Sequence, residues 1–179
     1  MIYLVGVDHK LQDGRSQPNS DDFVKYIRIV LKNRGITLLA EEWSADITNY
    51  RGESKLRNFE NRVKYVAFDL LKDEQKRWGI KSQEEIYKES GGTEIKPGVF
   101  RGFDPQQAAR LTREEAHKRE PGWLKKLSPH LKNTKNTLLV CGSDHLSPTN
   151  LEGKSGFDKK LRDAGFEVEI LACFFAGVG

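Results

Sequence analysis

The sequence predicts an α/β fold, with a mostly parallel sheet of about five strands, helices on both faces and a helical or loop insertion before the fourth strand. Two observations support this prediction. Short apolar segments alternate with longer segments in which apolar residues recur at helical spacing, and glycine or acidic residues follow most of the apolar segments. Strands and helices that alternate in this way form parallel sheets through right-handed crossovers.

The first quarter of the chain predicts a strand, a helix and a second strand. Residues 2–7 are apolar and β-branched, as in a buried strand. Residues 8–19 are polar, so we expect a loop. Residues 20–35 predict a helix, because a serine and two aspartates suit its start and a glycine suits its end. The second strand is expected at 36–40.

The later strands are expected on either side of a long polar stretch. Residues 65–68 predict the third strand and residues 137–141 the fourth. A helix is expected at 157–164 and a fifth strand at 166–171. Glutamates alternate along the fifth strand, which is typical of an edge strand with one exposed face.

The stretch between the third and fourth strands predicts an insertion within a single α/β domain that spans residues 1–179. Residues 72–130 are rich in Lys, Glu, Gln and Arg and predict helices. Residues 82–103 contain two glycine-rich breaks and predict a loop, which is either a lid over a site or a surface loop. Pro121-Gly122 is expected to kink or restart the helix there.

The composition indicates a cytoplasmic protein. The net charge is +4 with both signs interspersed, which permits a nucleic-acid partner without demanding one. The two cysteines lie in apolar segments, as expected of buried thiols in a reducing compartment. The first residues lack the basic region of a signal peptide, and no segment approaches the ~20 apolar residues of a membrane span. The sequence leaves the oligomeric state open.

A repeated Gly-x-Asp-His tetrad follows the first and fourth predicted strands and supplies His9 and His145, two of the four histidines. Ligands of parallel sheets lie at the carboxyl ends of the strands, and imidazole is the commonest neutral metal ligand. Asp8 and Asp144 are candidates to orient these histidines, and Asp69, after the third strand, is a further supporting candidate. A single tetrad of this kind is most simply explained as an ordinary turn after a strand. Two tetrads at equivalent strand ends indicate a functional site.

A pair of glutamates, Glu41 and Glu42, ends the second predicted strand. One of them is expected to complete a ligand set with the two histidines, and the other to act as a general base. Successive side chains of a strand point in opposite directions, so only one of the two can face the site. The sequence does not say which, and a solvated acidic pair remains the alternative.

Two further candidates lie in the insertion. Arg119 would clamp an anionic group, and Glu120 would anchor it or act at the metal. The alternative interpretation is that Arg119 and Glu120 belong to a charged, solvent-exposed face of a helix. His117 and His130 are expected at the surface. Phosphate-binding glycine motifs and the Gly-x-Ser-x-Gly elbow are absent, which removes the main support for kinase, P-loop, dinucleotide-binding and serine-hydrolase classes.

The order of these motifs resembles the TraB/Tiki/erythromycin-esterase-like hydrolases, and more closely their small stand-alone bacterial members. The matching segments are residues 6–12, 40–42, 65–80, 119–124 and 139–146. The resemblance implies a parallel α/β core that works either as a metal-dependent protease or as a metal-free esterase. It implies that His9, His145 and Glu41 or Glu42 are ligands or bases, with Arg119 and Glu120 in support.

The sequence therefore predicts a metal-dependent hydrolase of peptide, ester or similar bonds. His9, His145 and Glu41 or its neighbour would hold manganese or zinc. The first alternative is a non-catalytic module that binds a small nucleotide-like anion at the same strand ends. A weaker alternative is a nucleic-acid-processing enzyme.

Overall fold

The computed structural model describes residues 1–44, 53–147 and 156–175. The chain divides into two compact units. The sheet unit comprises Met1–Asp69 and Trp123–Gly179, and the insert unit comprises Leu70–Gly122.

The sheet unit contains a five-stranded parallel sheet in the order β3-β2-β6-β1-β7. Its strands are β1 (Ile2–Val7), β2 (Leu38–Glu41), β3 (Lys64–Ala67), β6 (Thr137–Gly142) and β7 (Val168–Phe174). The predicted fold class is confirmed, and the fifth predicted strand is an edge strand, half-buried along its length. The central strands β1 and β6 are fully buried, because helices cover both of their faces.

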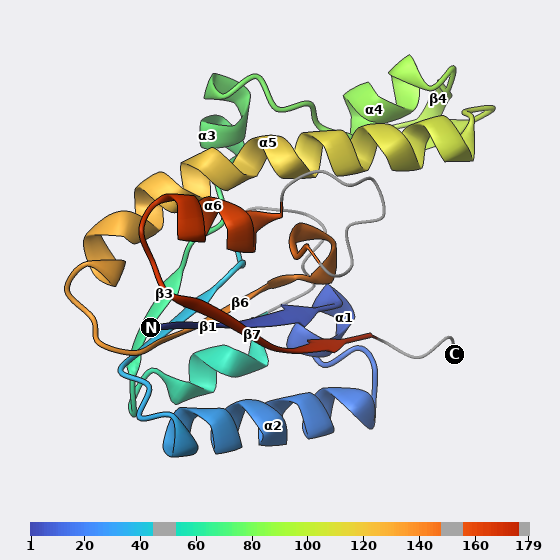
Figure 1. The fold of residues 1–179 in the computed structure, drawn as a ribbon. Coiled ribbons are helices and arrows are strands. Elements are labelled where there is room, and N and C mark those ends of the chain that lie inside the picture. The colour runs from blue at the N-terminus through green and yellow to red at the C-terminus, as the bar shows by residue number, and fades with distance from the viewer. Residues whose placement is uncertain (45–52, 148–155, 176–179) are drawn as a thin grey trace. The chain divides into compact units, whose positions relative to one another are not determined.

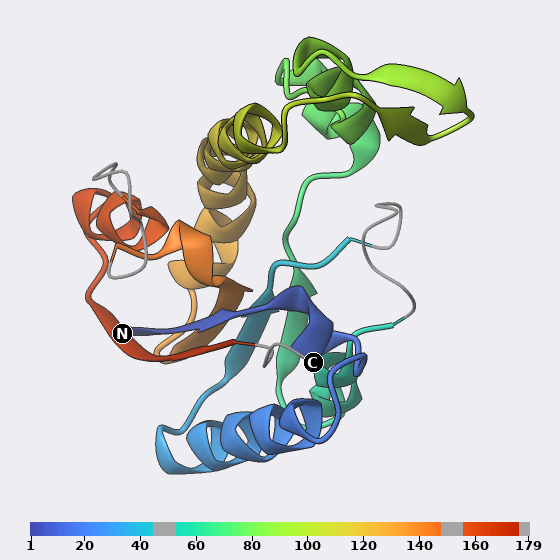
Figure 2. The same cartoon turned by 90° about the vertical axis from the view of Figure 1, so that its right-hand side faces the viewer.

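Helices lie on both sides of this sheet (Figures 1 and 2). α2 (Asn19–Asn33) covers one face together with the short 3₁₀ helix η1 (Lys55–Phe59). α6 (Phe157–Asp163) and the last turns of α5 (Pro105–Leu131) cover the other. The buried face of α2 carries Phe23, Ile27, Val30 and Leu31, at the helical spacing that the sequence shows.

A single-turn helix, α1 (His9–Gln12), follows β1 where the sequence predicts a loop. Asp8 is its N-cap: the side chain accepts a hydrogen bond from the Lys10 N–H at 2.9 Å. The turn places His9 and Gln12 on the same side, because residues three apart are neighbours on a helix.

The insert unit contains α3 (Lys72–Arg77), α4 (Gln83–Glu89) and the hairpin of β4 (Thr93–Lys96) and β5 (Val99–Arg101), followed by the start of α5. The prediction of a loop at 82–103 is therefore wrong. A capping box between Ser82 and Glu85 begins α4, and Gly98 turns the hairpin at a φ of +74°.

The helix α5 runs through Pro121 and Gly122 without a break, so the expected restart is wrong. A β-carbon on Gly122 would lie 3.0 Å from both methyl groups of buried Leu70. Glycine stands there because the helix packs closely on that leucine. No helix among the residues described has the length and apolar character that crossing a membrane requires.

Candidate functional site

Three adjacent strands of the sheet unit deliver titratable side chains to the same sheet edge. His9 begins α1 directly after β1, and Glu42 follows β2. His145 ends η2 (Ser143–His145), a 3₁₀ turn that follows β6. Because β6 lies between β2 and β1, these residues are neighbours although they are far apart in sequence.

The carboxylate of Glu42 lies between the two imidazoles. Its Oε1 is 3.6 Å from His9 Nε2 and 3.8 Å from His145 Nε2. Its Oε2 accepts a hydrogen bond from the Gly142 N–H at 2.7 Å. The Glu42 side chain is 0% exposed and that of His145 is 4% exposed, whereas that of His9 is 32% exposed. The cluster therefore reaches solvent on the His9 side.

Gly142 lies against all three side chains. A β-carbon there would be 3.4 Å from Glu42 Oε2, 3.4 Å from His145 Cδ2 and 3.5 Å from His9 Nε2. The glycine of the second tetrad thus leaves space at the point where the three functional groups meet.

Glu41 points into a different hydrogen-bond network. Its Oε1 accepts from Gln12 Nε2 at 2.7 Å and from Ser54 Oγ at 2.6 Å, and its Oε2 accepts from the Tyr65 hydroxyl at 2.5 Å. Burial raises the pKa of the Glu41 carboxyl, and these three donors only partly oppose that rise. Gln12 continues the network, since its Oε1 lies 2.5 Å from His9 Nδ1. Glu42 is thus the glutamate beside the histidines, and Glu41 lies behind His9.

His145 is held from the other side by a buried tryptophan. The Trp123 ring meets the His145 ring edge-on, with centroids 4.5 Å apart. Trp123 Nε1 donates to Asp69 Oδ1 at 2.8 Å, and both residues are buried. Asp69 therefore supports His145 through Trp123.

The sequence suggests that the aspartates of the two tetrads orient the histidines, but the structure places both aspartates elsewhere. Asp8 caps α1, and Asp144 is exposed on η2. Their shared spacing reflects turn chemistry after a strand, in which Asp is favoured whether or not a ligand is bound.

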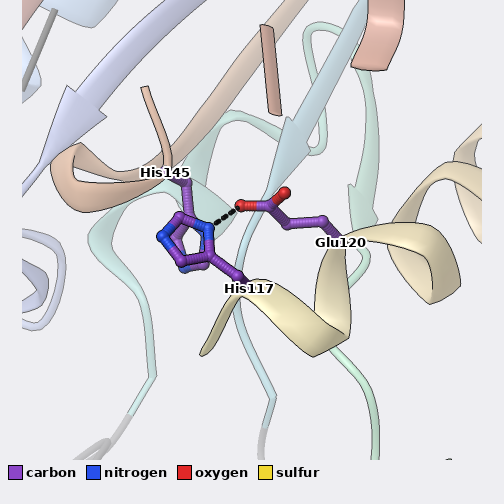
Figure 3. Close-up of side chains that lie close together, drawn as sticks. All are labelled: His117, Glu120 and His145. Carbon is purple, nitrogen blue, oxygen red and sulfur yellow. Dashed lines mark hydrogen bonds and ion pairs between the residues drawn. The ribbon is translucent and has the colours of Figure 1, made fainter. Parts of the chain in front are cut away.

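The helical candidates belong to the insert unit. Arg119 is partly exposed on α5, and Glu120 is fully buried. His117 Nδ1 lies 2.7 Å from Glu120 Oε1, one turn apart on the same helix (Figure 3). The His117 side chain is only 16% exposed, so the prediction that it lies at the surface is wrong. His145, also drawn in Figure 3, belongs to the sheet unit.

Sequence reasoning missed Gln12, Ser54 and Tyr65. The signal for Gln12 is its spacing of three from His9 behind a capping aspartate, which a single helical turn explains. Tyr65 shares a sheet face with Ala67, the register partner of Glu41. That register is not visible in the sequence.

No protein-family model, no curated protein and no solved structure matches this chain. The geometry of the sheet unit is therefore the basis on which a function can be inferred.

Proposed function

We propose that the chain is a metal-dependent hydrolase whose ion is held by His9, His145 and Glu42. The observation that carries this proposal is the approach of both Nε2 atoms to one oxygen of Glu42, at 3.6 and 3.8 Å. These separations are too long for hydrogen bonds. Two ligands of a tetrahedral zinc ion, with bonds of about 2.1 Å, are about 3.4 Å apart. The two distances to Glu42 Oε1 are close to this value, which supports a small divalent cation beside this oxygen.

Two imidazoles and a carboxylate are the ligand set of catalytic zinc sites that keep a position open for water. A zinc or manganese ion held there would lower the pKa of that water and polarise the carbonyl or phosphoryl oxygen of a substrate. The sequence suggests Glu41 as a metal ligand. We propose Glu42 in its place, because Glu42 is the glutamate that lies beside both histidines. Glu41 is also a poor general base, because both of its oxygens already accept hydrogen bonds.

The residues of the sheet unit prepare this site in three ways. The Gly142 N–H holds the Glu42 carboxylate, and Trp123 packs against His145, so two of the three ligands are fixed before an ion arrives. The partly exposed His9 provides access from solvent. Bonds of peptide or ester type are the substrates that this chemistry suits, and the proposal does not require Arg119 or Glu120.

The proposal is tested by elemental mass spectrometry on protein purified without a metal-affinity tag, before and after incubation with zinc or manganese. We expect near-stoichiometric metal in the wild type and none in the His9→Ala/His145→Ala double variant or in Glu42→Gln. His130→Ala is the matched control, since this histidine lies outside the cluster beside Lys64, and it should keep the metal.

Two results would contradict the metal site: a wild type that stays metal-free after zinc and manganese are added, or a double variant that binds as much as the wild type. Metal-loaded protein is then assayed on ester and peptide substrates. Tight metal binding without turnover of any of them would favour a binding module over a hydrolase.

A further inference from the structure

We propose that Gln12 is a positioning residue that fixes the proton of His9 on Nδ1, so that Nε2 faces Glu42 as an electron-pair donor. The consequence for metal affinity rests on the proposed function. The assignment of the proton rests on hydrogen-bond geometry alone.

Gln12 is placed between Glu41 and His9 by the short helix α1. Asp8 caps this helix, and Gln12 lies three residues after His9 on the same side of the turn. The Gln12 side chain is fully buried, at 0% exposure, which is rare for glutamine unless its amide is hydrogen-bonded at both ends. Both ends are bonded here, to Glu41 and to the His9 ring.

The donors around Glu41 determine which way the amide points. The hydroxyls of Ser54 and Tyr65 lie 2.6 and 2.5 Å from the Glu41 carboxylate and donate to it. A carboxylate that accepts from both hydroxyls offers the amide a further acceptor. The NH₂ end of Gln12 therefore turns to Glu41, and the carbonyl end turns to His9.

The carbonyl end determines the tautomer of His9. A carbonyl oxygen only accepts, so at 2.5 Å from Gln12 Oε1 the His9 Nδ1 must carry a hydrogen. A neutral imidazole has one N–H, and Nε2 is then left with its lone pair toward Glu42, 3.6 Å away. A lone pair and a carboxylate repel each other unless a cation lies between them.

Without Gln12, the favourable state of the metal-free protein is the other tautomer, with the Nε2–H donating toward Glu42. That proton must be displaced before a metal binds. Loss of such a supporting hydrogen bond typically lowers metal affinity by about 10–100-fold. Gln12 thus removes an obstacle to binding without contacting the ion.

The test is ¹⁵N NMR of the His9 ring in metal-free protein at about pH 9, where imidazoles are ordinarily neutral, beside zinc titrations against a competing chelator. We expect a protonated Nδ1 and an unprotonated Nε2 in the wild type. Gln12→Met, which keeps the side-chain length but removes the amide, should shift the proton toward Nε2 and lower zinc affinity about 10–100-fold. The matched control is Gln75→Met, which removes a glutamine hydrogen bond to Leu70 in the insert unit and should change neither readout.

A wild-type His9 that carries its proton on Nε2 would overturn the inference whether or not Gln12→Met folds. So would a folded Gln12→Met with unchanged tautomer and zinc affinity. If the wild type binds no zinc, the proposed function fails, and the ring spectrum still decides the role of Gln12.

Discussion

Gly142 is the residue whose backbone lies against all three side chains of the proposed metal site. Its φ of −53° and ψ of 135° are accessible to any L-residue, so the fold itself does not demand glycine there. A β-carbon there would make ordinary van der Waals contacts with His9, Glu42 and His145, and would fill the space beside all three side chains.

We expect Gly142→Ala to fold normally, because its β-carbon would meet the three side chains at ordinary van der Waals distances. It should bind zinc more weakly than the wild type, because the methyl group fills space beside all three proposed ligands. Zinc titration and thermal melting of the same sample measure the zinc affinity and the stability of Gly142→Ala.

Gly6→Ala is the contrasting variant. Its β-carbon would lie 2.9 Å from Cys173 Sγ and 3.1 Å from the Ser143 backbone, so it should cost about 1–3 kcal/mol of stability. A Gly142→Ala protein with wild-type zinc affinity would show that the ion does not lie there.

The sequence could predict which residue types meet at the carboxyl ends of the strands, but not which of these side chains contact one another. His9 and His145 follow apolar strands whose ends must meet in a parallel sheet, so their proximity follows from the fold class. The choice between Glu41 and Glu42 depends on the side to which each side chain turns at the end of β2. The Gln12–Glu41 contact joins residues 29 positions apart through side-chain packing that composition does not encode.

At the level of elements, prediction succeeded where apolar periodicity was strong. Central strands and α2 bury continuous or helically spaced apolar residues, and these patterns are visible in the sequence. The hairpin of β4 and β5 is largely exposed, so it shows no buried face to detect. Its one signal was Pro97-Gly98, which suits a tight turn between two short strands.

The start of α6 supports the segment that follows His145, through the buried carboxylate of Asp158. Asp158 Oδ1 accepts from the Ser147 N–H at 2.9 Å and from its hydroxyl at 2.8 Å, and Oδ2 accepts from Arg162 at 2.6 Å. Burial alone would raise the pKa of Asp158, but these hydrogen bonds outweigh it and hold the pKa below its usual value.

Because the pKa of Asp158 is lower in the folded state than in the unfolded state, the stability that it contributes falls as the pH falls. The contribution of Asp158 is fully present above the pKa of an unfolded aspartate, about 3.9, and is lost as the pH falls through the lower folded value. Urea unfolding from about pH 7 to about pH 2 should therefore give Asp158→Asn a lower stability at neutral pH and a smaller loss toward acid than the wild type. Asp163→Asn, on the exposed side of the same helix, should follow the wild-type curve. Parallel curves for Asp158→Asn and the wild type would exclude this role.

At the level of the whole molecule, the cluster exists only in the folded sheet unit. Its three proposed ligands follow β1, β2 and β6, and the pairing of β6 with β1 and β2 brings together segments that are far apart in the sequence. An unfolded chain holds residues 9, 42 and 145 too far apart to act together. An ion bound by them must therefore stabilise the folded state by mass action.

This linkage predicts the size of a thermal shift. Zinc or manganese at one hundred times its dissociation constant adds about 2.7 kcal/mol. For a chain of this size, 1 kcal/mol corresponds to roughly 2–4 °C, so the melting temperature should rise by roughly 5–11 °C. If the insert unit melts separately, only the transition of the sheet unit should move, because all three ligands belong to that unit. The His9→Ala/His145→Ala variant should show no rise, and an equal rise in both proteins would mean that the metal binds elsewhere on the chain.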